Sequence, residues 1–273
     1  MIIAPRQKRN LTQMAPTPAS LYSAKKFFLD IYRLYDRAAS AYSRDAPKFR
    51  DDLISRPLIV ELAKSHGYGK RIVDVGCGDG HISRLISTFA ETVVGVDLSA
   101  SMLNEAYRKS GLFKNVQFLR GNFLNLESTL PNQKFDVALG IFAFCCVKNL
   151  NQLDWAFRSI YQVLEKNATA IIQIPDEREN LSESSSQWIE DSPYSINEVG
   201  QLVNRRLKAI DDSWVDVARF HYRKKDYLNS ISKAGFRIEY ILEPKATSEL
   251  VNLHPSLKHE AEVSSSLILI LKK

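Results

Sequence analysis

Three alternating glycines are the residues of this chain best placed to approach a nucleotide. They lie in Val73-Asp-Val-Gly-Cys-Gly-Asp-Gly-His81, where the apolar run Ile72–Val75 ends. Glycine has no Cβ and accepts positive φ, so the backbone of such a turn can come very close to a ligand. A helix that begins at His81 adds free N–H groups in its first turn. The order strand, glycine turn, helix therefore indicates the first βα unit of a nucleotide-binding sheet.

The spacing of these glycines separates two classes of nucleotide-binding protein. Gly76, Gly78 and Gly80 form G-x-G-x-G, whereas nicotinamide-dependent oxidoreductases carry G-x-G-x-x-G. Such an oxidoreductase remains an alternative, because it shares the strand, the glycines and an acid after the second strand.

Further polar and aromatic residues follow the predicted strands at their carboxyl ends, where ligands of open α/β sheets bind. Asp97 ends the second strand, and a carboxylate there can accept hydrogen bonds from both ribose hydroxyls of a nucleoside. Asn122 and Phe123 follow the third strand and suit an adenine edge and face. The segment Gly140–Cys146 follows the fourth strand and forms the natural floor of a reaction site.

A regular alternation of apolar runs and amphipathic segments predicts the elements that position these residues. Strands are expected at 71–75, 92–96, 116–120, 135–141, 168–174, 236–242 and 266–271, with helices at 81–89, 101–109, 153–164 and 225–234. This repetition predicts an α/β fold, a three-layer doubly wound sheet with helices on both faces. Two N-terminal helices are expected at 21–42 and at 57–66, the second with Pro57 near its start.

The remaining segments break this rhythm. Residues 1–20 are predicted to be a disordered tail, and 21–273 to form one domain. Residues 177–220 are expected to be an inserted cap over the carboxyl ends of the strands, with a short helix near 196–207. Residues 247–262 resemble a hairpin-like excursion.

Composition limits the kinds of partner. The chain has 273 residues and a net charge of +6, but its basic clusters, such as Arg205-Arg206-Leu-Lys208, do not interleave regularly with aromatic residues. We interpret them as solvated surface, which disfavours nucleic-acid binding. The longest apolar run, Val137–Val147, is too short to cross a bilayer as a helix, so no membrane partner is expected.

The cysteines indicate a reducing compartment. Cys77, Cys145 and Cys146 are odd in number, and none has zinc-ligand spacing, so neither a disulfide framework nor a metal is predicted. We expect buried packing for Cys145 and Cys146, a cytoplasmic location, and a monomer or homodimer.

The ordered set of motifs resembles the class I S-adenosylmethionine-dependent methyltransferases. Val73–Gly80 is similar to their first motif, Val94–Ser99 to their second and Phe135–Gly140 to their fourth. Tyr35-Asp-Arg-Ala-Ala-Ser-Ala-Tyr42 resembles a helix of the small-molecule branch, and so does the stretch that begins at His221. The resemblance implies a Rossmann-like seven-stranded sheet whose last strand is antiparallel, with S-adenosylmethionine as cofactor and S-adenosylhomocysteine as product.

The resemblance also assigns residues to the cofactor. Gly76 would receive the methionine part, Asp97 the ribose, and Asn122 and Phe123 the adenine, although the family often has an acid where Asn122 stands. The other expected contacts are Leu98, Met102, Cys77, Gly78, Ile141, Tyr35, Tyr42 and Asp74.

Several of these residues have a structural alternative. The alternative for Asp97 is a role as the N-cap of the next helix, for which Ser99 competes. Asp74 either braces the glycine turn or touches the ligand, and Tyr42 is either core or a lid over the cofactor. His81 lies either near the cofactor tail or in a structural position.

The binding site of the methyl acceptor is predicted from aromatic residues and one histidine. His221 and Tyr222 are the candidate catalytic pair, because a histidine with an ordinary pKa can take a proton near pH 7; a purely structural histidine is the alternative. Phe142, Trp188 and Trp214 are expected to bind the substrate. The sequence thus predicts methyl transfer to a small molecule through an O, N or C nucleophile. The alternatives are an RNA or protein methyltransferase and a non-catalytic protein that binds the same cofactor.

Overall fold

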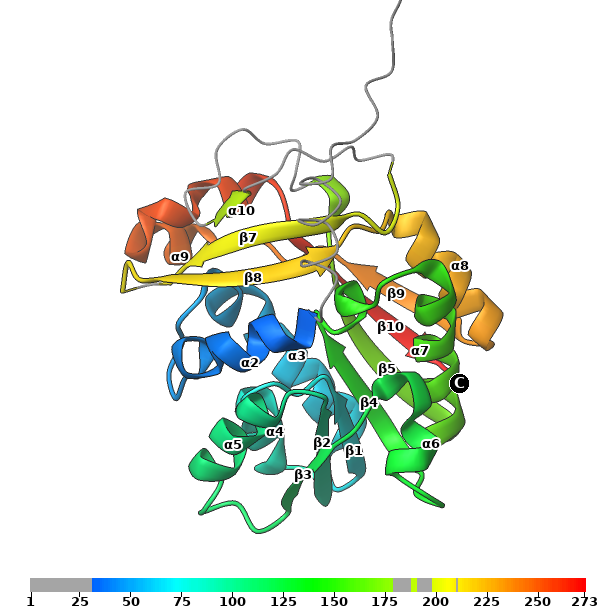
Figure 1. Cartoon of the computed structure of the whole chain (residues 1–273). Coiled ribbons are helices and arrows are strands. Elements are labelled where there is room, and N and C mark those ends of the chain that lie inside the picture. Colours follow the sequence, from blue (N-terminus) through cyan, green and yellow to red (C-terminus); the bar gives the residue numbers. More distant parts are fainter. Residues whose placement is uncertain (1–30, 179–187, 191–197, 210) are drawn as a thin grey trace, which may run out of the picture. The chain divides into compact units, whose positions relative to one another are not determined.

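Seven strands form one mixed sheet within the unit Ile31–Lys273 (Figure 1). The computed structural model describes residues 31–178, 188–190, 198–209 and 211–273, so the predicted tail and the start of the helix predicted at 21–42 lie outside it. The strand order is β3-β2-β1-β4-β5-β10-β9. The strands are β1 Arg71–Val75, β2 Thr92–Asp97, β3 Val116–Arg120, β4 Phe135–Ile141, β5 Leu164–Pro175, β9 Arg237–Leu242 and β10 Ser266–Lys272.

The direction of the strands confirms the predicted doubly wound sheet. β1 to β5 pair in parallel, whereas β10 runs antiparallel to both β5 and β9. The strand order reverses between β1 and β4, and ligands of such sheets bind outside the carboxyl ends at this point. The central strands are mostly apolar, with exceptions such as Asp74 in β1 and Gln173 in β5, because helices bury both of their faces.

Helices cover the two faces of the sheet. On one face Ile59 of α3 (Arg50–Gly67) and Ile82 of α4 (His81–Ser87) pack against β1 and β4. On the other face α7 (Leu150–Val163) and α8 (Lys224–Ala234) contribute Phe157 and Ile231. Within the residues that the structure describes, further helices before α8 are α2 Ile31–Tyr42, α5 Ala100–Lys109, η1 Phe123–Asn125, α6 Leu126–Thr129 and η2 Phe144–Cys146. These layers bring the glycine turn, Asp97 and η2 to one edge of the sheet.

The second N-terminal helix begins earlier than predicted. α3 starts at Arg50, so Pro57 lies inside the helix and not near its start, although the predicted stop at Gly67 is confirmed. The Asp52 carboxylate accepts hydrogen bonds from the backbone N–H groups of Lys48 and Phe49, both at 2.9 Å, and this fixes the true start. Pro57 is exposed, where the loss of one helical hydrogen bond is tolerated.

The helix predicted near 196–207 is wrong. Leu202–Lys208 forms strand β7, which pairs antiparallel with β8 (Trp214–Phe220) and with β6 (Trp188–Glu190). Val203 and Arg205 are buried whereas Arg206 is exposed, and this period of two is the signature of a strand with one covered face. In Figure 1 the yellow strands β7 and β8 pass beside α2, near the carboxyl end of β4.

The segment expected to resemble a hairpin is helical. It contains α9 Ser248–Leu253, η4 Pro255–Leu257 and α10 Lys258–Glu262. Thr247 caps α9 by accepting a hydrogen bond from the Leu250 N–H, which favours a helix over a strand at this point. None of the helices that the structure describes is both long and apolar enough to span a membrane.

Gly80 is the position of the turn where a side chain should cost most. Its φ is +71°, and an added Cβ would lie 2.5 Å from Cζ of the buried Phe118. We expect Gly80→Ala to lower the free energy of unfolding by about 2–5 kcal/mol, through backbone strain and overpacking together. Urea denaturation measures this effect. The control Gly111→Ala, where an added Cβ meets nothing within 4 Å, should change stability by less than about 1 kcal/mol; equal losses in both variants would contradict this account.

Candidate functional site

The glycine turn packs closely against the segment that follows β4 on one side, and it lines a cavity on the other. Gly76 has φ +70°, and an added Cβ would lie 2.6 Å from Cβ of Ala143. Gly78 has φ +55°, and its added Cβ would meet nothing within 4 Å. The backbone of Gly78 is therefore the part of the turn that a ligand can approach.

Asp97 is oriented by backbone hydrogen bonds on both of its carboxylate oxygens. Oδ2 accepts from the Gly78 N–H and Oδ1 from the Ser99 N–H, each at 2.8 Å. Burial raises the pKa of Asp97, although these backbone hydrogen bonds oppose the rise. Ser99 is the N-cap of α5, since its Oγ accepts from the Met102 N–H at 3.1 Å. Asp97 is thus not the cap of α5 but a fixed acceptor beside the turn.

The first cavity lies on the glycine turn, and we call it the glycine cavity. It holds about 350 Å³ of empty space, counting its open mouth. The predicted residues that line it are Tyr42, Asp74, Gly76, Cys77, Gly78 and Ile141. The other lining residues are Arg44, Arg56, Asp79, His81 and Ile82. The turn predicted from sequence therefore forms one wall of a real cavity.

His81 lines this cavity in its neutral form. Burial lowers its pKa to about 4, and the neighbouring positive charge of Arg44 acts in the same direction. His81 thus lies on the wall of the glycine cavity, and its place near the cofactor tail stays a prediction.

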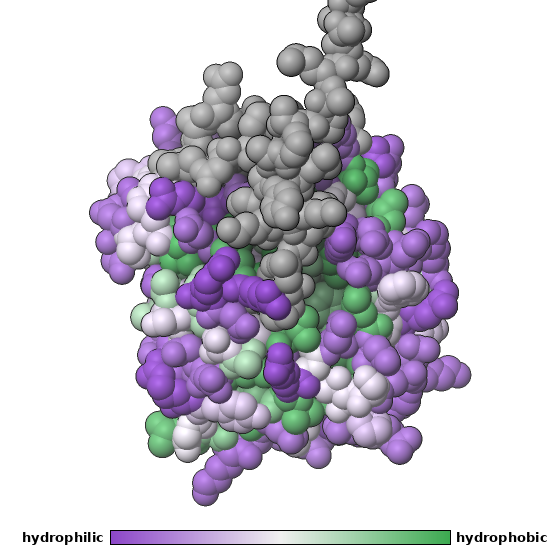
Figure 2. Space-filling view, in the orientation of Figure 1, coloured by the Kyte–Doolittle hydropathy of each residue, from purple (hydrophilic) through white to green (hydrophobic). Residues whose placement is uncertain are grey.

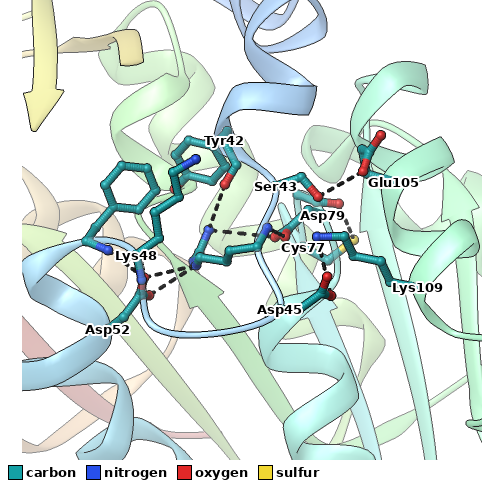
Figure 3. Close-up of polar contacts among 12 residues, drawn as sticks. Tyr42, Ser43, Asp45, Lys48, Asp52, Cys77, Asp79, Glu105 and Lys109 are labelled. Carbon is teal, nitrogen blue, oxygen red and sulfur yellow. Dashed lines mark hydrogen bonds and ion pairs between the residues drawn. The ribbon is translucent and has the colours of Figure 1, made fainter. Parts of the chain in front are cut away.

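Arg44 ties the segment after α2 to the glycine turn, and sequence reasoning missed it. Its backbone N–H donates to Oδ2 of Asp79 at 2.9 Å, and its Nε lies 3.0 Å from Oδ2 of Asp52. Beside it, Ser43 Oγ donates to Glu105 of α5 at 3.0 Å (Figure 3). No local motif signals these contacts, because Arg44 follows the end of α2 and its two carboxylate partners lie on two other segments, the glycine turn and α3.

Asp74 braces the turn. Its Oδ2 accepts a hydrogen bond from Ser83 Oγ at 2.5 Å, and burial raises its pKa to about 6, with a lowering by Ser83 and a further rise from the charge of Asp97. Asp74 also lines the glycine cavity, and the alternative that it touches the ligand stays a prediction.

The raised pKa of Asp74 predicts a pH dependence of stability. A carboxyl whose folded-state pKa lies above its unfolded value near 4 stabilises the fold fully below that value, and this contribution is lost as pH rises through about 6. Relative to Asp74→Asn, the wild type should lose about 2 kcal/mol of unfolding free energy between pH 4 and pH 7. Denaturation of both proteins at pH 4, 5, 6 and 7 measures the difference. Parallel curves for the two proteins would contradict the assignment.

The second cavity lies between α2, the start of α3, the end of β4 and the strands β7 and β8, and we call it the cap cavity. It holds about 660 Å³ of empty space, counting its open mouth. Its described lining residues are Tyr35, Tyr42, Phe49, Arg50, Asp51, Arg56, Phe142, Cys145, Pro175, Arg205, Leu207, Val217, Ala218, Arg219 and Ser265. The space-filling view in Figure 2 shows hydrophobic residues (green) gathered toward the middle of an otherwise mostly hydrophilic face.

The two cavities share two lining residues. Tyr42 and Arg56 belong to both walls, and the neighbours Ile141 and Phe142 at the end of β4 face one cavity each. Tyr42 also packs against Tyr35, with ring centroids 6.1 Å apart. Tyr42 is therefore a boundary between the cavities, as a lid would be.

The residues assigned to ribose and adenine lie beyond the glycine cavity, near the ends of β2 and β3. Leu98 is exposed and Met102 is buried beneath the start of α5. Asn122 is exposed and caps η1, because its Oδ1 accepts from the Leu124 N–H at 3.0 Å. Phe123 is half-buried and packs 6.0 Å from Phe144 between ring centroids.

The residues predicted to contact the methyl acceptor do not all line the cap cavity. Tyr222 is buried in the core and its hydroxyl donates to Val147 O at 2.6 Å, so its hydroxyl serves packing. His221 is fully buried just after β8 and lines neither cavity. Trp214 is 39% exposed, because strand alternation turns it to the face opposite Val215 and Val217. Trp188 lies in β6, and its side chain is outside the described residues.

Two residues that were given no binding role from the sequence line the cap cavity. Arg205, interpreted as solvated surface, is buried on the covered face of β7, whereas its neighbour Arg206 is exposed as expected. Cys145 is buried as predicted, but it also reaches the cavity wall. The signal for Arg205 is the period of two over Leu202–Lys208, which appears once that segment is assigned as a strand.

Comparisons with known proteins agree with this architecture. A family model described as "Methyltransferase domain" matches residues 66–235. An uncharacterised protein of Haemophilus influenzae is 25% identical over 82% of this chain and 86% of its own length. A demethylmenaquinone methyltransferase of Tropheryma whipplei is 24% identical over 54% of this chain and 59% of its own length.

Solved structures show the same fold. The N-methyltransferase NodS of Bradyrhizobium japonicum, in complex with S-adenosyl-L-homocysteine, superposes with a TM-score of 0.59 at 9% identity, over 89% of this chain and 98% of that one. The matched residues 66–235 run from the end of α3 to the end of α8 and so include the glycine turn and Asp97. The chain belongs to the class I S-adenosylmethionine-dependent methyltransferases.

Proposed function

We propose that this chain binds S-adenosylmethionine along the glycine cavity and transfers its methyl group to a small molecule held in the cap cavity. The observation that carries this proposal is the shared boundary at Tyr42 and Arg56. A methyl donor and an acceptor must meet at such a boundary, because in-line displacement needs both in one enclosed space.

The residues at the glycine cavity fit the cofactor. The open position at Gly78 leaves backbone accessible to the methionine part, and Asp97 presents a carboxylate already aligned by two N–H groups. Arg44 and Arg56 lie on the cavity wall together with Asp74 and Asp79, and guanidinium groups are suitable hydrogen-bond donors for the carboxylate of the cofactor. When bound, S-adenosylmethionine supplies an activated methyl group on a sulfonium sulfur.

The chain itself contributes alignment and exclusion of water. Tyr42 packs beside Phe49, with ring centroids 5.3 Å apart, and both residues line the cap cavity. Burial raises the pKa of Tyr35 well above its ordinary value, so its phenol stays protonated at neutral pH. These residues orient and desolvate an acceptor, which is how binding geometry accelerates a displacement.

A small-molecule acceptor is favoured by the lining of the cap cavity, in which aromatic and apolar side chains are combined with a few charged ones. We include β6–β8 in this proposal as the substrate cap expected from sequence, since β7 and β8 supply one wall. The relative named demethylmenaquinone methyltransferase is likewise named for a small acceptor.

Calorimetry of the purified chain tests the cofactor. S-adenosylmethionine and S-adenosylhomocysteine should each bind at one site, and NAD should not; the reverse result would favour the oxidoreductase alternative. A screen of small acceptors should then yield S-adenosylhomocysteine. Cofactor binding without product from any acceptor would favour the non-catalytic alternative, and cofactor-dependent methylation of RNA or protein would favour a macromolecular acceptor.

A further inference from the structure

Helix α2 contacts both the strands that wall the cap cavity and the helix that follows the proposed ribose site. In Figure 1 the blue helix α2 lies between the strands β7 and β8 and the helix α5. On the side of the strands, Tyr35, Ala38 and Tyr42 pack against a cluster that includes Val215 and Val217 of β8. Tyr35 and Tyr42 also line the cap cavity. The position of α2 therefore sets the position of the aromatic wall of that cavity.

On its other side α2 reaches the segment that carries Asp97. Oδ1 of Asp36 accepts a hydrogen bond from Ser99 Oγ and another from the Ser101 N–H, the latter at 3.1 Å. Burial would raise the pKa of Asp36, but the hydrogen bonds from Ser99 and Ser101 and the charge of Arg120 lower it overall. Asp36 is thus a charged acceptor at the N-terminus of α5, where the helix dipole favours a carboxylate.

Ser99 connects Asp36 to the proposed ribose site through a continuous chain of hydrogen bonds. Its hydroxyl donates to Asp36 and accepts from the Met102 N–H, so both of its hydrogen-bonding functions are used. Its backbone N–H donates to Oδ1 of Asp97, and Oδ2 of Asp97 accepts from the Gly78 N–H. A ligand that fixes Asp97 also restricts Ser99, so less ordering remains to be done when Ser99 binds Asp36.

A second hydrogen bond between the α2 region and α5 lies away from the cofactor. Ser43, directly after α2, donates to Oε2 of Glu105 at 3.0 Å. Glu105 lies in the middle of α5, whereas Ser99 caps its first turn. Asp36 and Glu105 are therefore a matched pair of acids. Each accepts a serine hydroxyl across the contact between α2 and α5, but of the two only Asp36 contacts the residue that holds Asp97.

We propose that Asp36 is a positioning residue that couples occupancy of the ribose site at Asp97 to the position of α2, and so prepares the aromatic wall of the cap cavity for the acceptor. This inference rests on the proposed function. The coupling follows the path from Asp97 through Ser99 to Asp36, and from there along α2 to Tyr35 and Tyr42. Cofactor binding then favours the arrangement of α2 in which the acceptor is received.

Hydrogen exchange of the backbone amides of α2, followed by mass spectrometry, tests the coupling with S-adenosylhomocysteine as the ligand. In the wild type, saturating S-adenosylhomocysteine should slow exchange over residues 31–42 at least about fivefold, the low end of typical coupling between sites. In Asp36→Ala this slowing should fall below about twofold, while residues 73–80 of the glycine turn remain protected by the ligand. Because coupling is reciprocal, calorimetry should find S-adenosylhomocysteine weaker for Asp36→Ala by about the factor that is lost.

Further variants separate coupling from the stability of the helix. Glu105→Ala removes the matched hydrogen bond but leaves Asp36 bonded to Ser99, so the ligand should still slow exchange of α2 at least about fivefold. Tyr42→Leu removes an aromatic wall of the glycine cavity but keeps Asp36, and should keep the slowing over residues 31–38. Asp36→Asn keeps one acceptor oxygen without the charge and should show an intermediate slowing, which provides the measurement if Asp36→Ala does not fold.

The inference is overturned if S-adenosylhomocysteine does not slow exchange of α2 in the wild type, or slows it equally in the folded Asp36 variants. It is also overturned if Glu105→Ala or Tyr42→Leu loses the slowing as fully as Asp36→Ala. General docking of α2, or direct contact of the cofactor with Tyr42, would then explain the protection. Failure of S-adenosylhomocysteine to bind the wild type at all would instead overturn the proposed function.

Discussion

Asp97→Ala should weaken S-adenosylmethionine binding by at least about 100-fold. The carboxylate is proposed to accept both ribose hydroxyls, and two charge-assisted hydrogen bonds are together worth about 3 kcal/mol or more. Its two oxygens are already aligned by the Gly78 and Ser99 N–H groups, so little further ordering is needed on binding. Calorimetry with S-adenosylmethionine measures the loss directly.

Matched variants separate binding from folding in this experiment. Asp97→Asn keeps one acceptor oxygen and should retain an intermediate affinity. Glu91→Ala, an exposed acid just before the opposite end of β2, should bind like the wild type. Thermal midpoints of all three proteins report any loss of fold. Wild-type affinity in a folded Asp97→Ala variant would contradict the ribose assignment.

Asp52→Asn should lower the free energy of unfolding by about 3–5 kcal/mol. The carboxylate is buried between two guanidinium groups, with Nε of Arg44 at 3.0 Å and Nε of Arg56 at 2.6 Å. Removal of its charge leaves two buried cations without their shared counter-ion, which is the costly way to break such a cluster. It also weakens the acceptor of the Lys48 and Phe49 N–H groups at the start of α3.

An exposed ion pair provides the control for Asp52. Arg206 and Asp216 lie 3.0 Å apart at 50% and 66% exposure, so Asp216→Asn should cost less than about 1 kcal/mol. Urea denaturation of both variants at pH 7 gives the comparison. A loss below about 1 kcal/mol in Asp52→Asn would contradict the view that the ion pairs of Asp52 with Arg44 and Arg56 stabilise the start of α3.

The acid sensitivity of this cluster has a definite sign. Burial alone would raise the pKa of Asp52, but the charges of Arg56 and Arg44 and the backbone hydrogen bonds lower it overall. A depressed folded-state pKa stabilises the fold above the unfolded value near 4, and this contribution is lost as pH falls through the folded value. Asp52 and Asp74 therefore act in opposite directions with pH.

The amino-acid sequence by itself determined the sheet, the glycine turn and Asp97, because these depend on patterns a few residues long. Buried parallel strands are continuous apolar runs, and the acid that ends β2 is adjacent in sequence to its strand. Such local signals do not depend on contacts with distant parts of the chain. They were sufficient to predict the antiparallel last strand through family resemblance.

Only the tertiary structure decided which side chains reach the cavities. Arg44 and Asp52 meet through contacts among α2, α3 and the glycine turn, and Arg205 faces inward because β7 and β8 pair in one particular register. A strand register or a long-range ion pair depends on distant segments, and a shift of one residue turns every side chain of a strand to the other face. For the same reason Trp214, which was chosen for its residue type, lies on the exposed face of β8. Arg205, which was interpreted as solvated surface, instead forms part of the wall of the cap cavity.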